Sequence, residues 1–186
     1  MKTTLNEIRK HHPCIGGWKK LLKKLNKTKP DDEPLPLLTV FESNGFKDTL
    51  WCLEKLYGHK ELVKLGLLFV KEIEHLMPEE SVKALAVFER YVDGKATYGE
   101  FSAACNAARL AYSATEPSNY CADAAAYAAL ATSAATYIEI DYAAAYAALA
   151  AAHSHYPYNS YNANTKSEMQ EKQIQILRKF LKANLV

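Results

Sequence analysis

The sequence predicts an all-α fold. Apolar residues recur at helical spacings of three and four through most of the 186 residues, and the alternation typical of strands is nearly absent. Alanine is concentrated in the C-terminal half, where "AAAYAALA" occurs at 124–131 and again at 143–150. We therefore expect one domain of eight or nine helices with a closely packed alanine-rich helical layer in its C-terminal half. Its parts are mixed amphipathic helices over 1–94, alanine- and tyrosine-rich helices over 95–156, and a loop with a basic C-terminal helix over 157–186.

The first helices are predicted to be amphipathic and separated by proline and glycine. Pro13 ends the first of them, and the linker "KTKPDDEPLP" carries three prolines that exclude a regular helix. Asn44-Gly45 and Gly94 are typical of helix C-termini. The segment 60–76 is the most apolar and should be central to the core. The predicted helices of this part cover residues 4–11, 18–27, 37–43, 46–57, 60–76 and 78–93.

Capping-box signals introduce helices in the second half. In a capping box, a Thr hydroxyl accepts a hydrogen bond from the backbone three residues later, and a Glu at that position reaches back. "TYGE" at 97–100 fits this pattern and introduces a helix over 98–113, and "TKSE" at 165–168 should open the last helix. Two further alanine-rich helices are expected over 119–137 and 141–155. No glycine or proline marks a bend between them, so a single long helix stays open as the alternative.

The alanine and tyrosine pattern predicts closely packed helices with a row of rings. Faces made of methyl groups let helices approach at the short end of the usual range, and alanine has the highest helix propensity. The same faces could pair two copies of the chain as a homodimer. Tyrosine rings here either belong to the core or form a recognition surface. Nine of the twelve tyrosines lie in residues 112–161, so we expect some of them to contact a partner. The candidates are Tyr142, Tyr146, Tyr156 and Tyr158.

Charge is segregated along the chain. Residues 1–29 hold nine Lys or Arg and one acid, residues 30–160 hold nine and eighteen, and residues 161–186 hold five and two. In the predicted helix 18–27, apolar residues share one face and lysines take the opposite face. This lysine face is either simply solvated or a binding surface, for nucleic acid phosphates or for an acidic protein. Its members are Lys19, Lys20, Lys23, Lys24 and Lys27.

The remaining polar clusters favour structural roles over chemistry. Asp31-Asp32-Glu33 could hold a divalent cation or act as an acid and base, but capping of the next helix is favoured. Histidines near Cys14 lack a second ligand pair at a spacing typical of zinc sites, and no common catalytic motif occurs. We therefore expect no metal, no cofactor and no enzymatic activity. The histidines weighed as zinc ligands are His11, His12, His153 and His155.

The N-terminal segment and the hydropathy pattern predict a cytoplasmic protein without a membrane span. "MKTTLNEIRKHHPC" has no apolar region of the kind that secretory signals carry. No stretch approaches ~18 apolar residues free of charge, because Asp123, Glu139 and Asp141 interrupt the alanine tract.

Several short sequence motifs in the first half of the chain resemble those of a known protein family. Cys14, Gly17-Trp18, "TKPDDEPLPLLT", "SNG" and "LWCL" occur in an order that resembles a bacterial and prophage family of alanine-rich, all-helical immunity proteins. The resemblance covers roughly residues 4–155. The chain departs from the family pattern by using tyrosine where more tryptophan and arginine are expected, and by its basic C-terminal helix.

The resemblance implies a small non-enzymatic protein that neutralises a toxin or a defence factor. We expect a stoichiometric inhibitor of the immunity or anti-defence type, encoded by a phage or prophage, that occludes a protein target such as an effector nuclease. The alternative is a helical protein that binds nucleic acid through residues 19–27. A small metal-assisted enzyme is the third and least favoured reading.

Overall fold

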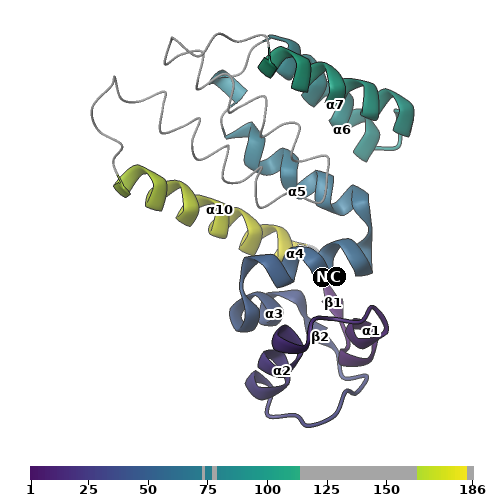
Figure 1. Ribbon diagram of the computed structural model, residues 1–186, viewed down its shortest axis with the longest axis vertical. Coiled ribbons are helices and arrows are strands. Elements are labelled where there is room, and N and C mark those ends of the chain that lie inside the picture. Colours follow the sequence, from purple (N-terminus) through teal and green to yellow (C-terminus); the bar gives the residue numbers. More distant parts are fainter. Residues whose placement is uncertain (73, 77–78, 114–162, 184–186) are drawn as a thin grey trace. The chain divides into compact units, whose positions relative to one another are not determined.

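Figure 1 shows the computed structural model of the chain, which describes residues 1–72, 74–76, 79–113 and 163–183. These residues form eight α-helices, one 3-10 helix and a two-stranded ribbon, which confirms the predicted all-α fold. The helices expected over 119–137 and 141–155 lie outside the described residues. The elements are β1 Lys2–Thr3, α1 Leu5–Lys10, α2 Ile15–Lys24, β2 Leu35–Pro36, α3 Leu37–Asn44, α4 Phe46–Tyr57, α5 His59–Lys71, the 3-10 helix η1 Glu74–Leu76, α6 Glu79–Val92, α7 Tyr98–Ser113 and α10 Ala163–Ala183.

Contacts within the chain define two compact units. The first consists of Met1–Glu61 and Leu177–Val186, and the second is Leu62–Ile176. The organisation into a single domain stays a prediction.

The first unit contains a short ribbon that the sequence did not predict. β1 pairs antiparallel with β2, with Lys2 opposite Pro36 and Thr3 opposite Leu35. Two residues per strand are too few to produce a visible alternation of polar and apolar side chains, so periodicity could not reveal it. Thr4 follows β1 directly and caps α1, because its Oγ1 accepts a hydrogen bond of 3.1 Å from the Glu7 backbone N–H.

The core of the first unit is aliphatic. Helices α1, α2, α3 and α4 each contribute at least one side chain to the buried set, and the end of α10 does so through Leu177 and Leu181. The backbone carbonyl of Leu181 also accepts a hydrogen bond of 3.1 Å from the Met1 nitrogen. These contacts hold the C-terminal part of α10 against the N-terminal segment. Hydrophobic side chains with at most 1% exposure here are Leu5, Leu37, Val40, Leu53, Leu177 and Leu181.

Helix α2 is three residues shorter at its end than the predicted helix over 18–27. Asn26 adopts a left-handed conformation with φ 54°, its N–H donates to the Lys23 carbonyl, and the Lys27 N–H donates to the Leu22 carbonyl. This pair of bonds is a Schellman motif, which ends the helix at Lys24. Asparagine adopts the left-handed conformation that glycine usually provides at a helix end. The sequence pattern therefore did not predict that the helix ends at Lys24.

The second unit contains a hairpin of α6 and α7, which lie side by side in Figure 1. Phe101 of α7 packs against Phe88 at 5.1 Å and stacks on Tyr91 at 4.4 Å between ring centroids. Gly94 has φ 75° and ends α6, as predicted. The most apolar predicted helix, over 60–76, is observed as α5, which ends at Lys71, five residues earlier than predicted. Most of its residues from Leu62 to Val70 are buried, which confirms its place in a core. The buried residues of α5 are Leu62, Val63, Leu65, Gly66, Leu67, Phe69 and Val70.

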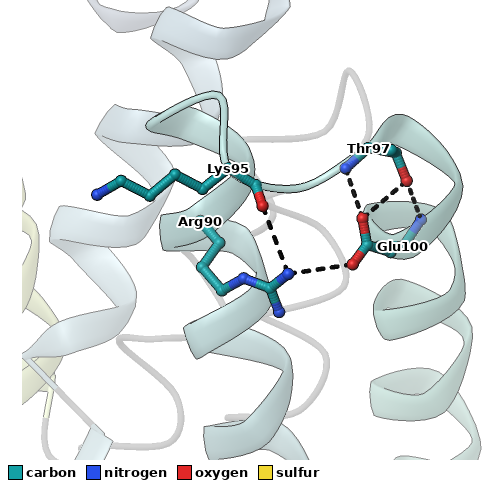
Figure 2. A network of polar contacts seen from close by, with 4 residues as sticks. All are labelled: Arg90, Lys95, Thr97 and Glu100. Carbon is teal, nitrogen blue, oxygen red and sulfur yellow. Dashed lines mark hydrogen bonds and ion pairs between the residues drawn. The ribbon is translucent and has the colours of Figure 1, made fainter.

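The predicted capping box at 97–100 is confirmed (Figure 2). The Glu100 backbone N–H donates to Thr97 Oγ1 at 3.2 Å, and Glu100 Oε2 accepts from the Thr97 backbone N–H at 2.7 Å. Arg90 adds a bond of 3.1 Å to Glu100 Oε1 and therefore ties α6 to the start of α7. The helix occupies Tyr98–Ser113, which are the predicted bounds.

The second predicted capping box, at 165–168, is wrong. Helix α10 already begins at Ala163, two residues before Thr165. Alanine is a strong helix former, and no glycine or proline separates it from Thr165, so the helix extends through this residue. The exposed face of α10 is polar and carries Glu171, Lys172, Gln175, Arg178, Lys179 and Lys182.

Candidate functional site

The first unit contains a pocket with a volume of about 170 Å³. Helices α1, α2, α3 and α4 and the segment before α2 contribute to its walls. Its floor includes aliphatic side chains that are buried in the core of the unit, which gives the pocket a firm base. These side chains are Ile8, Leu21 and Val40.

Both tryptophans of the chain line this pocket. Trp18 comes from α2 and Trp51 from α4, and each is half-buried. Half-buried tryptophan is enriched at protein interfaces, because it presents a large apolar surface together with one hydrogen-bond donor. Ile15, one turn before Trp18, adds an apolar side chain that is 74% exposed. This region therefore presents more apolar surface than ordinary solvent exposure requires.

A polar bracket holds the pocket-lining helices together. Asn44 Nδ2 donates to the Gly17 carbonyl at 2.8 Å and to Asp48 Oδ2 at 2.7 Å, and so joins α2, α3 and α4. A Cβ atom at position 17 would overlap the Asp48 carboxylate and lie 3.1 Å from Cys14 Sγ. A side chain at position 17 would therefore force the Asp48 carboxylate to move from its place in the bracket.

Two buried side-chain oxygens beside the bracket have no hydrogen-bond partner among the residues that the structure describes. They are Ser43 Oγ and Asn44 Oδ1, at the end of α3. A buried polar atom left without a partner costs about 1–3 kcal/mol, and such atoms in a native fold are uncommon.

The two cysteines of the pocket differ in their surroundings. Cys14 is exposed and caps α2, because its Sγ accepts a hydrogen bond of 3.3 Å from the Gly17 N–H. Cys52 is buried, and burial, with a smaller contribution from Asp48, raises the pKa of its thiol to about 12. The Cys52 thiol is therefore protonated and unreactive at neutral pH.

The lysine face of α2 is largely confirmed. Leu21 is buried while Trp18 and Leu22 are half-buried, so one side of the helix faces the unit. The opposite side carries lysines that are exposed and make no ion pair within the described part of the chain. They are Lys19, Lys20, Lys23 and Lys24.

Lys27 lies apart from that face. It follows the end of α2, and its Nζ lies 2.7 Å from Asp31 Oδ2 and 2.5 Å from Glu33 Oε2. Its hydrogen bonds to the two carboxylates raise the pKa of Lys27, and the bond to Asp31 contributes most. The same bond is the main reason why the pKa of Asp31 is lowered. Lys27 is therefore already engaged within the molecule.

The acids at 31–33 do not cap the next helix, which corrects the favoured expectation. Strand β2 lies between them and α3, whose N-cap residue Pro36 makes no side-chain hydrogen bond. Asp31 instead accepts a bond of 3.2 Å from the Glu33 backbone N–H and pairs with Lys27. The cluster thus stabilises the turn that leads from α2 to β2.

The other predicted candidates fall into two groups. His11 and His12 are exposed in the segment between α1 and α2. Among residues whose positions the structure gives, no three His, Cys, Asp or Glu side chains come together as a metal site would require. The tyrosine candidates and two histidines lie outside the described residues, namely Tyr142, Tyr146, Tyr156, Tyr158, His153 and His155.

The pocket itself was missed by pattern analysis. Trp18 and Leu21 were assigned to a helix face, and Asn44 only to a helix end. Their convergence depends on contacts between residues about 30 positions apart, which periodicity does not report. The one local signal was Gly17, since a glycine inside a helix often marks a close backbone approach.

The chain matches no family model, no curated protein and no solved structure with which it was compared. Separately, none of the helices in the described ranges has both the length and the apolar character needed to cross a lipid bilayer.

Proposed function

We propose that the protein is a non-catalytic inhibitor of the immunity or anti-defence type, which binds a toxin or defence protein stoichiometrically and occludes it. The contact surface lies on the first unit and includes the lysine face of α2 and the neighbouring pocket. The protein acts in the cytoplasm, and its binding requires no metal or cofactor.

One observation carries the proposal. The short sequence motifs that resemble the immunity family are spread over some 40 residues. Most of them nevertheless contribute residues that line one pocket. "SNG" supplies Asn44, and "LWCL" supplies Trp51 and Cys52. Only the proline-rich segment "TKPDDEPLPLLT" stands outside the lining. The resemblance thus concentrates on the lining of a surface pocket, which favours a shared binding role beside the structural roles of Cys14, Gly17 and Asn44. The remaining motifs supply Cys14, Gly17 and Trp18.

The composition of the surface supports a protein target. Interface centres are rich in tryptophan, and exposed charges at their edges raise association rates more than affinity. The first unit combines both, with two half-buried tryptophans and four exposed lysines on α2. A partner with an acidic surface fits this arrangement.

Co-purification from the natural host tests the proposal. The tagged chain should retain one protein at a fixed molar ratio, and nuclease treatment should leave that ratio unchanged. The variant K19E/K20E/K23E/K24E should lose this protein, because four attractive charges become repulsive. A matched control is K172E/K179E/K182E, which reverses exposed lysines of α10 and should retain the protein.

Absence of a stoichiometric protein in repeated purifications would contradict the proposal, and so would equal retention by both variants. If the chain instead retains nucleic acid, the second candidate function applies. The exposed lysines then contact phosphates, and affinity must fall steeply with salt and vanish in the α2 variant.

A further inference from the structure

Building on the proposed function, we infer that the pocket receives one apolar, ring-sized side chain of the partner, and that acidic residues beside this anchor contact Lys20, Lys24 and Lys47. The occupant is thus an acidic segment of a protein that presents a single aromatic or large aliphatic residue. The pocket makes the main contribution to affinity, and the lysines select the acidic flanks.

The size and lining of the pocket fit one ring. An apolar cavity of about 150 Å³ in an engineered protein stays dry and binds benzene. The pocket of the first unit measures about 170 Å³, and apolar atoms form most of its surface. Burying a phenylalanine or leucine side chain there removes its apolar surface from water, which is the usual source of affinity at an interface anchor.

Two of the four lysines on α2 lie next to the pocket-lining row. Residues three apart on a helix are surface neighbours. Lys20 is three residues from Gly17 and Lys24 is three residues from Leu21, and both of these lining residues face the pocket. Lys47, at the start of α4, lines the pocket directly and is exposed.

Lys19 and Lys23 provide a contrast on the same helix. No residue three or four positions from either of them lines the pocket. They are as exposed as the other pair and have the same i,i+4 spacing. The two pairs therefore share charge, helix and spacing and are both exposed, and they differ in whether they adjoin the pocket-lining residues of α2.

The lysines beside the pocket are available for a partner. Within the described chain, Lys20, Lys24 and Lys47 make no ion pair, whereas Lys27 is already held by Asp31 and Glu33. The bracket of Asn44 with Gly17 and Asp48 preforms the walls, so binding requires little ordering of the site.

A short synthetic peptide tests the inference with the full chain. The probe has one phenylalanine between aspartate and glutamate residues and contains no tryptophan or tyrosine. Trp18 and Trp51 are the only tryptophans of the chain and both line the pocket, so intrinsic tryptophan fluorescence reports on this site alone. We expect a saturable change in emission on titration.

Three comparisons define the expected result. Replacing the phenylalanine of the peptide by alanine should weaken binding at least tenfold, because the anchor is lost. The variant K20E/K24E should weaken binding of the original peptide several-fold, whereas K19E/K23E should stay within about twofold of the unaltered protein. Raising salt from 0.1 to 1 M should reduce affinity for the acidic peptide, because screening shortens the range of the lysine charges.

Each contrary outcome overturns the inference. These outcomes are no saturable emission change at millimolar peptide, equal binding of the alanine peptide, or equal effects of the two double variants. Because the probe is synthetic, its failure leaves host-protein capture standing. If the peptide binds and no host protein is captured, the proposed function fails and the pocket assignment stands.

Discussion

Gly17 is the residue on which the candidate site depends most directly. Its missing side chain lets the carbonyl of α2 reach Asn44 Nδ2 at 2.8 Å, while the Asp48 carboxylate occupies the space of a Cβ. A mid-helix glycine normally lowers helix stability relative to alanine by about 1 kcal/mol. At this position the close packing of three helices offsets that cost.

Gly17→Ala should therefore lower the free energy of unfolding by about 1 kcal/mol or more, because the methyl group displaces Asp48 and disturbs the Asn44 bracket. Gly16→Ala is the matched control. A Cβ there meets no atom within 4 Å, so the substitution should be neutral or stabilising by up to about 1 kcal/mol. Denaturant unfolding followed by tryptophan emission measures both. Equal stability of the two variants would show that the bracket is not tight.

The cysteines permit a second test at the same scale. Iodoacetamide should label Cys14 in the native protein, because its thiol is exposed. Cys52 should remain unlabelled until the chain unfolds, since its thiol is buried and burial raises its pKa to about 12. Peptide mass spectrometry resolves the two sites. Native labelling of Cys52 at the rate of Cys14 would mean that the pocket opens widely.

At the scale of single elements, local signals predicted most helices and some of their ends. The helices at 46–57 and 98–113 have the predicted bounds. Glycines flank the first helix, and the capping box at 97–100 determines the start of the second. Errors occur where an unusual residue performs the capping. Cys14 caps α2 through sulfur, and Asn26 ends it in a left-handed conformation. Neither residue type is the common choice for its position, so pattern analysis placed α2 about three residues too late.

The capping box of α7 predicts a defined pH dependence. Hydrogen bonds from the Thr97 backbone and hydroxyl, with a further contribution from Arg90, lower the pKa of Glu100. A carboxylate whose pKa is lowered on folding stabilises the protein above its unfolded value of about 4.3, and this contribution disappears as pH falls through the folded pKa.

Glu100→Ala should therefore destabilise the protein at pH 7, and the difference from the unaltered protein should shrink as pH falls below about 4. Glu100→Gln is the control, because glutamine can still accept the Thr97 bonds but does not titrate. Thermal or denaturant unfolding at a series of pH values gives the comparison. A difference that stays constant down to pH 3 would exclude the ionised capping bond.

At the scale of the whole molecule, the sequence was informative about fold class and charge but not about the site. Helical periodicity depends on neighbours three and four positions apart, so it reported the elements and the exposed lysines of α2. The pocket requires Cys14, Asn44 and Trp51 to meet, and that depends on how α2, α3 and α4 pack. The resemblance proposed from the sequence rests on the same three segments, although the order of short motifs cannot show that they share one surface.

Charge segregation is the second property at this scale. Residues 1–29 hold nine basic residues and one acid, while residues 30–160 hold twice as many acids as bases. Part of the basic charge is used internally, as at Lys27 with Asp31 and Glu33. The lysines of α2 instead keep their positive charges exposed. The electrostatic field of such exposed charges increases the rate of association with an acidic partner.

Lysine footprinting of the complex with the captured protein tests the central claim, that the pocket and its neighbouring lysines form the contact surface. Acetylation of exposed lysines is measured by mass spectrometry in the free protein and in the complex. The account predicts that Lys20, Lys24 and Lys47 lose reactivity several-fold on binding, while Lys172 and Lys179 of α10 keep theirs. Unchanged reactivity at Lys20, Lys24 and Lys47 in a fully formed complex would contradict it.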